Sequence, residues 1–529
     1  MGNSTSSSHS PLHPAAERVD AVQVRIHNPH HIPATLFASS EVPIERAGVD
    51  QALGLLDVQH TIERLRAHQP DFFGDLEPTI EQLVLTPDFH PSGGGIPVGS
   101  VLATRGFILP QAVGNDICCG MRVLVVKGVS QEELAKHERD LLLRLRQIFF
   151  EGQRDIAMSP LQREAMLREG LTGLLETFDR ARASHGWRDY DPVRQERDLA
   201  RTHLSGSLHT AGVFAFDDFI QASGSAASRD SQIGSVGGGN HFVEIQRVEA
   251  IEDNVRAHAW GIEPGDLTVM AHSGSVGLGR RVGQHFVRLA REHFPAGLSH
   301  PDNGFYPLAQ EGPRAELFAA YIDAMRNAAN FAFANRLFLG LMALRALSDV
   351  LGRRVEASLL YDAPHNLIWS ERGDGEQGRS AHGIRHVHRK GACPAYGPSL
   401  DAGQDPFAYT GPPVIVPGSM GDASYLLAGE GNAHALCSAC HGAGRKISRQ
   451  MARHEPAEAM AGLRVVTPID LHGQMLREHR EIRQRLMDRL REESPSSYKD
   501  VSPVVDTIDA AGIARKVARL TPWLTIKSI

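Results

Sequence analysis

The stretch GNDICCGMRVLVVK, residues 114–127, joins a glycine-bounded polar turn to a run of apolar and β-branched residues. Its second half, MRVLVVK at 121–127, is typical of a short β-strand. The turn before it carries Asp116 and Cys119, three positions apart, so both side chains can face one point in space. An acid and a thiol placed in this way can both face one metal ion.

Strand-like and helix-like segments alternate on both sides of this stretch. They are, in order, helical at 41–70, strand-like at 82–86 and 100–108, helical over a block at about 130–200, helical at 314–350, and charged and amphipathic at 474–493. The glycine-rich stretches 221–235 and 371–383 are expected to be loops. No linker is long or polar enough to force a domain boundary. The expected fold class is therefore α/β (mixed α+β), built as one large catalytic body over residues 17–529.

Residues 1–16, MGNSTSSSHSPLHPAA, are rich in Ser, Pro and His and show no apolar periodicity. We expect a disordered polar tail here, without the apolar stretch of a signal peptide. The five cysteines of the chain are too few for a disulfide scaffold, and their odd number leaves at least one unpaired. No uninterrupted apolar run approaches the length of a membrane span. These features predict a cytoplasmic protein without a transmembrane segment.

The overall charge limits the kind of nucleic-acid binding that is possible. The chain has 55 basic and 62 acidic side chains, a net charge of -7 and a pI near 6.5. This balance excludes a protein that grips a polyanion with its whole surface, although it allows a local basic site. The chain also has 27 histidines, an unusually large number. Histidine is the commonest metal ligand and proton carrier.

Glycine and histidine occur together in a few short segments. These are PDFHPSGGGIPVG (87–99), GNDICCGMRV (114–123), GGGNHFVEI (237–245), AHSGSVGLGRR (271–281), YDAPHNLIW (361–369), HVHRKGACPA (386–395), VPGSMGDASYL (416–426) and CHGAGRKISR (440–449). Glycines beside polar residues let a backbone approach a ligand closely and offer N–H groups to phosphates. The segments predict one site assembled from many parts of the chain.

One interpretation of these segments is a metal site. An isolated Asp/Cys pair is more often a turn with a buried thiol, and a lone histidine is more often structural. The chain, however, offers a whole set of such ligands in similar loops: Asp116, Cys119, His241, His272 and His365. This set is sufficient for two metal ions bridged by the thiolate.

The segment Cys437-Ser-Ala-Cys440-His441 has two functional readings. The C-x-x-C-H pattern is that of c-type haem attachment, which requires export, and no signal peptide precedes it. In the other reading His441 is a nucleophile beside a phosphate cradle formed by Gly442, Gly444 and the arginines that follow.

Basic residues also cluster next to these loops. One cluster comprises Arg385, His386, His388, Arg389 and Lys390, and the other comprises Arg445, Lys446, Arg449 and Arg453. A run of charge is usually a solvated face. Because both clusters adjoin the Gly/His loops, they favour a path for a polyanion into the site.

From about residue 82 to the C-terminus, the ordered motifs resemble the RtcB-type RNA ligases. The matching motifs are Asp-x-x-Cys-Gly at 116–120, Gly-Gly-Gly-Asn-His-Phe at 237–242, His-Ser-Gly-Ser at 272–275, His-Asn at 365–366, His-Arg-Lys-Gly-Ala at 388–392 and His-Gly-Ala-Gly-Arg at 441–445. The resemblance implies an enzyme of RNA repair or tRNA splicing that joins a 3′-phosphate or 2′,3′-cyclic phosphate end to a 5′-hydroxyl end. It would use GTP, through a histidine–GMP intermediate and an RNA carrying GMP on its 3′-phosphate.

The resemblance also implies roles for individual residues. His441 would take up GMP, and Asp116, Cys119, His241, His272 and His365 would hold two Mn²⁺. GTP would be contacted by Asn240, Glu244, Ser419, Gly442, Gly444, Tyr498 and Lys527, and RNA phosphates by Arg389, Lys390, Arg445 and Arg449. Tyr498 would stack on guanine, while Glu244 and Lys527 would complement its donors and its O6 acceptor. An activating protein partner is compatible with the resemblance.

The chain departs from the family pattern at several positions. Cys118 stands where the family has Gly, and Val276 stands where it has an Arg expected to hold an RNA phosphate. Val276 is the best support for an alternative function, a dinuclear metallo-phosphohydrolase that acts on RNA end phosphates without sealing. A haem-carrying redox protein is the third hypothesis.

Overall fold

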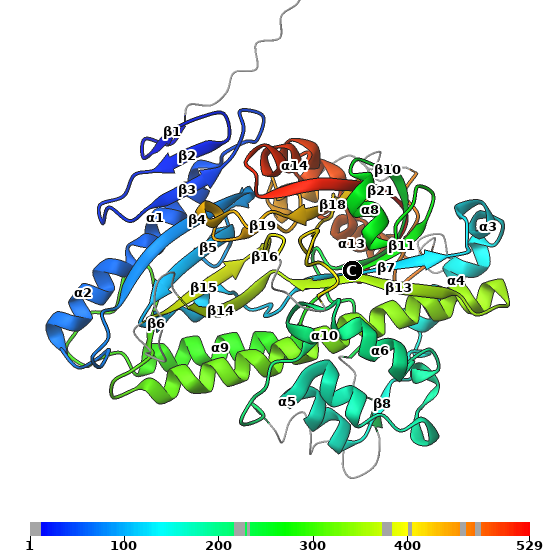
Figure 1. Ribbon diagram of the computed structural model, residues 1–529, viewed down its shortest axis with the longest axis horizontal. Coiled ribbons are helices and arrows are strands. Elements are labelled where there is room, and N and C mark those ends of the chain that lie inside the picture. The colour runs from blue at the N-terminus through cyan, green and yellow to red at the C-terminus, as the bar shows by residue number, and fades with distance from the viewer. Residues whose placement is uncertain are drawn as a thin grey trace, which may run out of the picture.

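The computed structural model describes residues 12–215, 228–229, 233–372, 383–399, 405–454, 462–470 and 478–529. Within these residues, a seven-stranded and an eight-stranded sheet form the body of the protein, with helices packed around them (Figure 1). The fold class is mixed α/β, as the sequence predicted. A large buried apolar cluster takes side chains from Val24 near the start of the described chain to Ile526 near its end.

Both large sheets are mostly antiparallel. The first has the order β1 (Ala16–Arg18), β2 (Gln23–Ile26), β3 (Ala34–Phe37), β4 (Thr79–His90), β5 (Val98–Arg105), β15 (Ile384–Lys390) and β14 (Asn366–Arg372). The second has the order β13 (Glu356–Pro364), β7 (Gly120–Lys127), β11 (Leu267–Ser273), β10 (Phe242–Ile251), β21 (Ala514–Ile526), β18 (Ser424–Gly429) and β17 (Pro413–Val416), with β20 (Val465–Val466) beside β21. Small ribbons pair β6 (Phe107–Ile108) with β12 (Leu308–Ala309), β16 (Ala392–Pro394) with β19 (Ser438–Cys440), and β8 (Ala157–Met158) with β9 (Ser228–Arg229).

The helices cover these sheets. They are α1 (Arg46–Leu56), α2 (Val58–His68), α3 (Gln131–Lys136), α4 (Glu138–Phe149), α5 (Pro160–Glu176), α6 (Pro192–Leu199), α8 (Asn254–Trp260), α9 (Val276–Glu292), α10 (Ala315–Leu351), α11 (Arg449–Ala452), α13 (Arg480–Arg491) and α14 (Val501–Ala510). In Figure 1, α9 and α10 lie side by side beneath the sheets, and α10 packs against β7 and β11. β7 is a strand, as MRVLVVK predicted, and its residues from Gly120 to Val126 are all buried.

Helix α10 is the centre of the fold. By length and composition it could cross a membrane, but 94% of its most apolar window is buried inside the protein. Unlike a lipid-facing helix, it also carries buried Asn327, Asn330, Asn335 and Arg336. These side chains bond to the backbone of neighbouring loops; Asn335, for example, donates to Gly274 O at 3.2 Å. The helix is therefore a core helix that also positions loops.

The predicted elements are found with shifted boundaries. The helix predicted at 41–70 is split into α1 and α2, and the amphipathic stretch after Ser130 is split at His137 into α3 and α4. Ser130 caps α3, because its Oγ accepts a hydrogen bond from Glu133 N at 3.2 Å. Of the predicted tail, residues 1–11 lie outside the described residues, whereas Ala16 already belongs to β1. Most of the two predicted glycine-rich loops also lies outside them.

Candidate active site

Neighbouring strands of the eight-stranded sheet bring the predicted metal ligands to one edge. Because the strands β13, β7, β11 and β10 are antiparallel neighbours, the end of one lies beside the start of the next. His365 follows β13, Cys119 precedes β7, His272 lies near the end of β11, and His241 precedes β10. The register pairs Ser273 with Gly120, and Gly120 with Pro364. Segments far apart in sequence therefore converge.

The donor atoms of these residues are close enough to share a metal ion. The Sγ atom of Cys119 lies 3.2 Å from Nε2 of both His241 and His272, and the three donors lie within 4.8 Å of one another. Asp116 Oδ2 lies 2.7 Å from His241 Nε2. The His365 ring lies 5.2 Å from the His272 ring, so it borders the cluster rather than joining its closest group.

The protonation of the cluster fits a cation. Burial and the neighbouring histidines hold the pKa of His272 and His365 well below the usual value, so both rings are neutral and can donate electron pairs. Val236 O lies 3.1 Å from His241 Nδ1, which directs Nε2 of that ring toward the cluster. Burial and Asp116 raise the pKa of the Cys119 thiol, and a bound cation is the partner that would stabilise its thiolate. The residues present therefore fit a metal ion.

Arg336 of α10 fixes the backbone on which this cluster is built. Its Nη1 donates to Cys118 O at 2.6 Å and to Ser273 O at 3.0 Å, and its Nε donates to the buried Asp362 at 2.9 Å. The Cys118 thiol also lies on this side, 3.9 Å from Arg336 Nη2. The extra thiol therefore faces the arginine, and Cys118 occupies the left-handed backbone region (φ 56°) that favours glycine.

His441 lies directly beside this cluster and is held by a buried carboxylate. Its ring lies 4.7 Å from the His365 ring. Its Nδ1 lies 2.6 Å from Oδ2 of Asp88, whose other oxygen accepts from the Thr86 hydroxyl at 2.5 Å. Burial alone would raise the pKa of Asp88, but His441 lowers it, so the carboxylate is ionised. With Nδ1 occupied by Asp88, Nε2 is the nitrogen of His441 left for chemistry.

The glycines after His441 permit a close approach of the chain to Asp88. Gly444 has φ +77°, and a Cβ at this position would lie 2.2 Å from Asp88 O. Gly442 lies beside His441 in the cavity wall. Within the C-x-x-C-H segment, Cys440 is fully buried in β19, whereas Cys437 is partly buried.

A cavity of about 550 Å³ opens from His441 and His272. Every GTP-contacting residue expected from the resemblance lines it, namely Asn240, Glu244, Ser419, Gly442, Gly444, Tyr498 and Lys527. A cavity of this size can hold a nucleotide. The structure therefore brings all seven of these residues together around one cavity.

The cavity wall carries a buried carboxylate, Glu244, and a buried ammonium group, Lys527. Glu244 accepts hydrogen bonds from Thr525 Oγ1 at 2.5 Å and Gln246 Nε2 at 2.6 Å, and burial raises its pKa to about 7. Lys527 is 3% exposed, and its Nζ donates to His241 O at 3.2 Å. The C-terminal lysine is therefore an ordered part of the site and not a frayed end.

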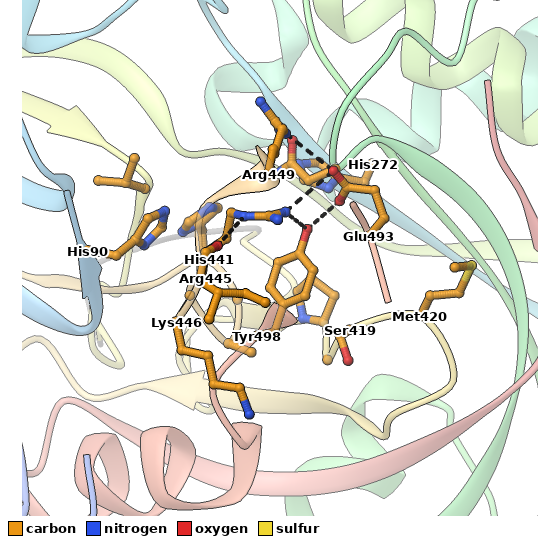
Figure 2. Close-up of a pocket in the computed structure, with 18 of the residues that line it drawn as sticks. His90, His272, Ser419, Met420, His441, Arg445, Lys446, Arg449, Glu493 and Tyr498 are labelled. Carbon is orange, nitrogen blue, oxygen red and sulfur yellow. Dashed lines mark hydrogen bonds and ion pairs between the residues drawn. The ribbon is translucent and has the colours of Figure 1, made fainter. Parts of the chain in front are cut away.

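Figure 2 shows Arg445, Arg449 and Tyr498 converging on Glu493. The Arg445 guanidinium lies 4.8 Å from the centre of the Tyr498 ring, so it covers one face of the ring. A stacking base would therefore use the opposite face. Lys446 extends away from this group in Figure 2 and is exposed.

The predicted RNA-binding residues fall into two groups. Arg445 and Arg449 line the cavity, and the Arg449 side chain is half-exposed. Lys390 lies next to the cavity, with its Nζ donating to Ser92 Oγ at 3.1 Å and to Ile96 O at 2.7 Å.

Arg389, by contrast, is fully buried. Its guanidinium donates to Ser438 Oγ and Leu436 O and packs on the Trp369 ring. The side chain is therefore not placed where RNA could reach it.

Val276 begins α9 at φ 49°, beside the Asp116–Cys119 turn that Gly274 also contacts. A β-branched residue is rarely found in this left-handed region. The position therefore combines backbone strain with the loss of the cation expected there.

Sequence reasoning missed Asp88, Glu493 and Thr525. Asp88 stands in the glycine-rich segment 87–99, which was recognised, but its partner His441 is 353 positions away. Glu493 stands in an ordinary charged run, and Thr525 lies in an apolar strand, so neither carried a signal.

Comparison with known proteins agrees with this geometry. The residue pattern of the family described as "tRNA-splicing ligase RtcB" matches residues 74–528. The chain is 36% identical over 450 residues to the "RNA-splicing ligase RtcB" of Mycobacterium tuberculosis, covering 83% of this chain and 95% of that protein. It is 32% identical over 455 residues to the "tRNA-splicing ligase RtcB" of Pyrobaculum aerophilum, covering 84% and 87%.

A eukaryotic relative shows similar coverage. The chain is 33% identical over 466 residues to the "RNA-splicing ligase RtcB homolog 1" of Entamoeba dispar, covering 85% of this chain and 79% of that protein. The match takes in the strands and turns that form the Cys/His cluster and the cavity. This chain belongs to the RtcB family of RNA ligases.

Proposed function

We propose that the protein is a GTP-dependent RNA ligase that joins a 3′-phosphate or 2′,3′-cyclic phosphate end to a 5′-hydroxyl end. The observation that carries this proposal is the contact of 2.6 Å between His441 Nδ1 and Asp88, in the wall of a nucleotide-sized cavity beside a Cys/His cluster. A histidine oriented in this way is suited to nucleophilic attack.

In the first step, Nε2 of His441 attacks the α-phosphorus of GTP, and pyrophosphate leaves. Asp88 holds Nδ1 of the ring throughout and balances the positive charge that develops on it. Gly442 follows His441 in the cavity wall, and its lack of a side chain lets a phosphate group approach the backbone closely. The product of this step is GMP joined to His441.

Asp116, Cys119, His241, His272 and His365 would hold two Mn²⁺. Bound there, the ions would withdraw charge from phosphate oxygens. The proposal of Mn²⁺ rests on the family resemblance, because a Cys/His/Asp set intrinsically prefers Zn²⁺.

Guanine is selected by Glu244 and Lys527 in the cavity wall. The Glu244 carboxylate can accept from the N1–H and N2–H₂ groups of guanine, and the Lys527 ammonium can donate to O6. The 6-amino group of adenine would meet the ammonium as a second donor. Tyr498 would stack on the base with the face that Arg445 leaves open.

The later steps transfer GMP to an RNA end and then replace it. The RNA 3′-phosphate takes GMP from His441, and the 5′-hydroxyl of the second end attacks this activated phosphate and releases GMP. A cyclic phosphate is first opened by hydrolysis. Once pyrophosphate has left, Arg445, Arg449 and Lys390 would hold RNA phosphates near the cavity, in agreement with a local rather than a whole-surface basic site.

Val276 favours one alternative function. Without the family's arginine at this position, RNA ends would be held less firmly. The protein could then act as a dinuclear metallo-phosphohydrolase that opens or removes end phosphates without sealing. This alternative needs neither His441 as a nucleophile nor GTP.

Covalent labelling tests the proposal. The protein is incubated with α-labelled GTP and Mn²⁺ and separated under denaturing conditions. We expect a labelled protein, no label on His441→Ala, and full label on the control His434→Ala, whose side chain is exposed and outside the cavity. Equal label on His441→Ala would refute the role of His441.

A further inference from the structure

Glu493 is a buried carboxylate in the cavity wall with contacts on two sides. It follows α13, and its side chain is 5% exposed. Its Oε1 lies 3.4 Å from both Arg445 Nη1 and Arg449 Nε. Its Oε2 accepts a hydrogen bond from the Tyr498 hydroxyl and lies 3.9 Å from Lys527 Nζ. A single side chain thus touches both the base-facing and the phosphate-facing groups.

The carboxylate is ionised in this position. Burial alone would raise the pKa of Glu493, but Lys527 and Arg445 outweigh burial and lower it. A buried charge is stable only when it is paired, and Glu493 and its cations satisfy this need for one another.

On the base-facing side, Glu493 fixes two groups. The Tyr498 hydroxyl donates to Glu493 and accepts from Arg445 Nη1 at 3.0 Å, which sets the plane of the ring. Lys527 lies between Glu493 and Glu244, both of which attract its ammonium group electrostatically. Without Glu493, Lys527 would be drawn toward Glu244 alone.

On the phosphate-facing side, the contacts of Glu493 are weak enough to exchange. At 3.4 Å they are longer than the roughly 2.7–2.9 Å of a strong charge-assisted hydrogen bond. Arg449 also reaches the segment 237–241, since a Cβ on Gly239 would lie 2.8 Å from its Nη2. Phosphate oxygens entering here can therefore replace Glu493 as the partner of both arginines.

We propose that Glu493 is a positioning residue that sets the base specificity of the cavity. It holds Tyr498 and Lys527 in the arrangement that distinguishes guanine from adenine, and it occupies Arg445 and Arg449 until the phosphates of a nucleoside triphosphate take them over. This inference rests on the proposed function for the identity of the ligand, GTP.

Removing the charge of Glu493 has opposite effects on the two sides. Base selectivity falls, because Lys527 and Tyr498 lose the group that places them. Affinity for the phosphates does not fall, because the two arginines lose a competing anion. A purely structural role would instead weaken the binding of every ligand together.

Calorimetry separates these outcomes. Dissociation constants for GTP, ATP and inorganic triphosphate are measured in a His441→Ala background, so that no covalent transfer disturbs the equilibrium. Glu493→Gln is compared with Glu492→Gln, a matched control whose carboxylate pairs with the half-exposed Arg453 outside the cavity. We expect Glu493→Gln to reduce the preference for GTP over ATP by about 10-fold or more, as for loss of one charged hydrogen-bond partner. Triphosphate should bind equally well or more tightly, and Glu492→Gln should change nothing.

Several results would overturn the inference: an unchanged preference in Glu493→Gln, equal weakening of all three ligands, or equal affinity of the parent for GTP and ATP. Thermal melting checks that each variant is folded. If Glu493→Gln does not fold, Tyr498→Phe replaces it as the test variant, because it removes only the hydroxyl that donates to Glu493. It should lower the preference for GTP over ATP without weakening the binding of triphosphate. A parent that prefers GTP but is never labelled at His441 would refute the proposed function and leave this inference standing.

Discussion

Asp88 and His441 are 353 positions apart in the sequence, yet Oδ2 of the first lies 2.6 Å from Nδ1 of the second. Asp88 is carried on β4 of the seven-stranded sheet, and His441 follows β19, which packs against β4. The pair joins the proposed nucleophile to a fully buried carboxylate. This contact determines which nitrogen of His441 can react.

Asp88→Asn should slow labelling of His441 without preventing GTP binding. The amide has nearly the same shape but no charge, so it neither fixes the tautomer nor balances an imidazolium ion. We expect the labelling rate to fall by up to about 10⁴-fold, the loss seen when the carboxylate behind a catalytic histidine is neutralised. Single-turnover labelling gives the rate and calorimetry gives the affinity. An unchanged rate would mean that Asp88 has no such role.

Gly444→Ala should damage the same contact by a steric route. The new Cβ would lie 2.2 Å from Asp88 O at a backbone φ of +77°. The left-handed backbone costs about 1–2 kcal/mol, and the clash adds about 1–3 kcal/mol. Gly265→Ala is the matched control, because Gly265 has φ +91° and open space around it. Thermal melting should show a larger loss for Gly444→Ala, and similar losses in both would show that Asp88 moves aside freely.

The two adjacent cysteines should differ in their effect on bound metal. Cys119→Ala removes the donor that lies 3.2 Å from two histidines, so metal content and activity should both be lost. Cys118→Gly should keep both, because its thiol faces Arg336. Its stability should change by no more than about 1 kcal/mol, since relief of the left-handed backbone offsets lost packing. Elemental analysis after gel filtration measures the metal, and the reverse pattern would reassign the ligand.

GTP affinity should increase with pH through the titration of Glu244. Burial raises the pKa of Glu244 to about 7 from an ordinary value of 4.5. Only the ionised form accepts from both guanine donors, so affinity should rise between about pH 6 and 8. The folded state holds this proton longer than the unfolded state, so the free energy of unfolding should fall as pH rises from about 4.5 to 7. Both trends should flatten in Glu244→Gln, and an unchanged affinity profile in that variant would exclude Glu244 as their source.

The sequence predicted local features and missed long-range ones. MRVLVVK predicted β7 because an apolar, β-branched run of this length is characteristic of a strand. The segments that converge on the Cys/His cluster stand out in the sequence because glycine and histidine mark them locally. The antiparallel order of β13, β7, β11 and β10, which brings these segments to one edge, depends on pairing across the whole chain and has no local signal.

Arg389 and Glu493 show that the charge pattern of a segment does not predict which of its side chains face the site. Arg389 was expected to face RNA because it stands in a basic run, but β15 turns it inward onto Trp369. Glu493 looked like part of a solvated charged run, but the chain after α13 turns it into the cavity among three cations. Charge patterns give the composition of a segment, whereas tertiary packing decides which face is buried.

The most direct test of the central claim is a sealing assay with two RNA strands. One strand ends in a 3′-phosphate and the other begins with a 5′-hydroxyl, and both are incubated with the protein and Mn²⁺, with and without GTP. We predict a sealed product that requires GTP and is absent with His441→Ala. Trimmed ends without sealing, formed equally well without GTP, would contradict the ligase and establish the phosphohydrolase in its place.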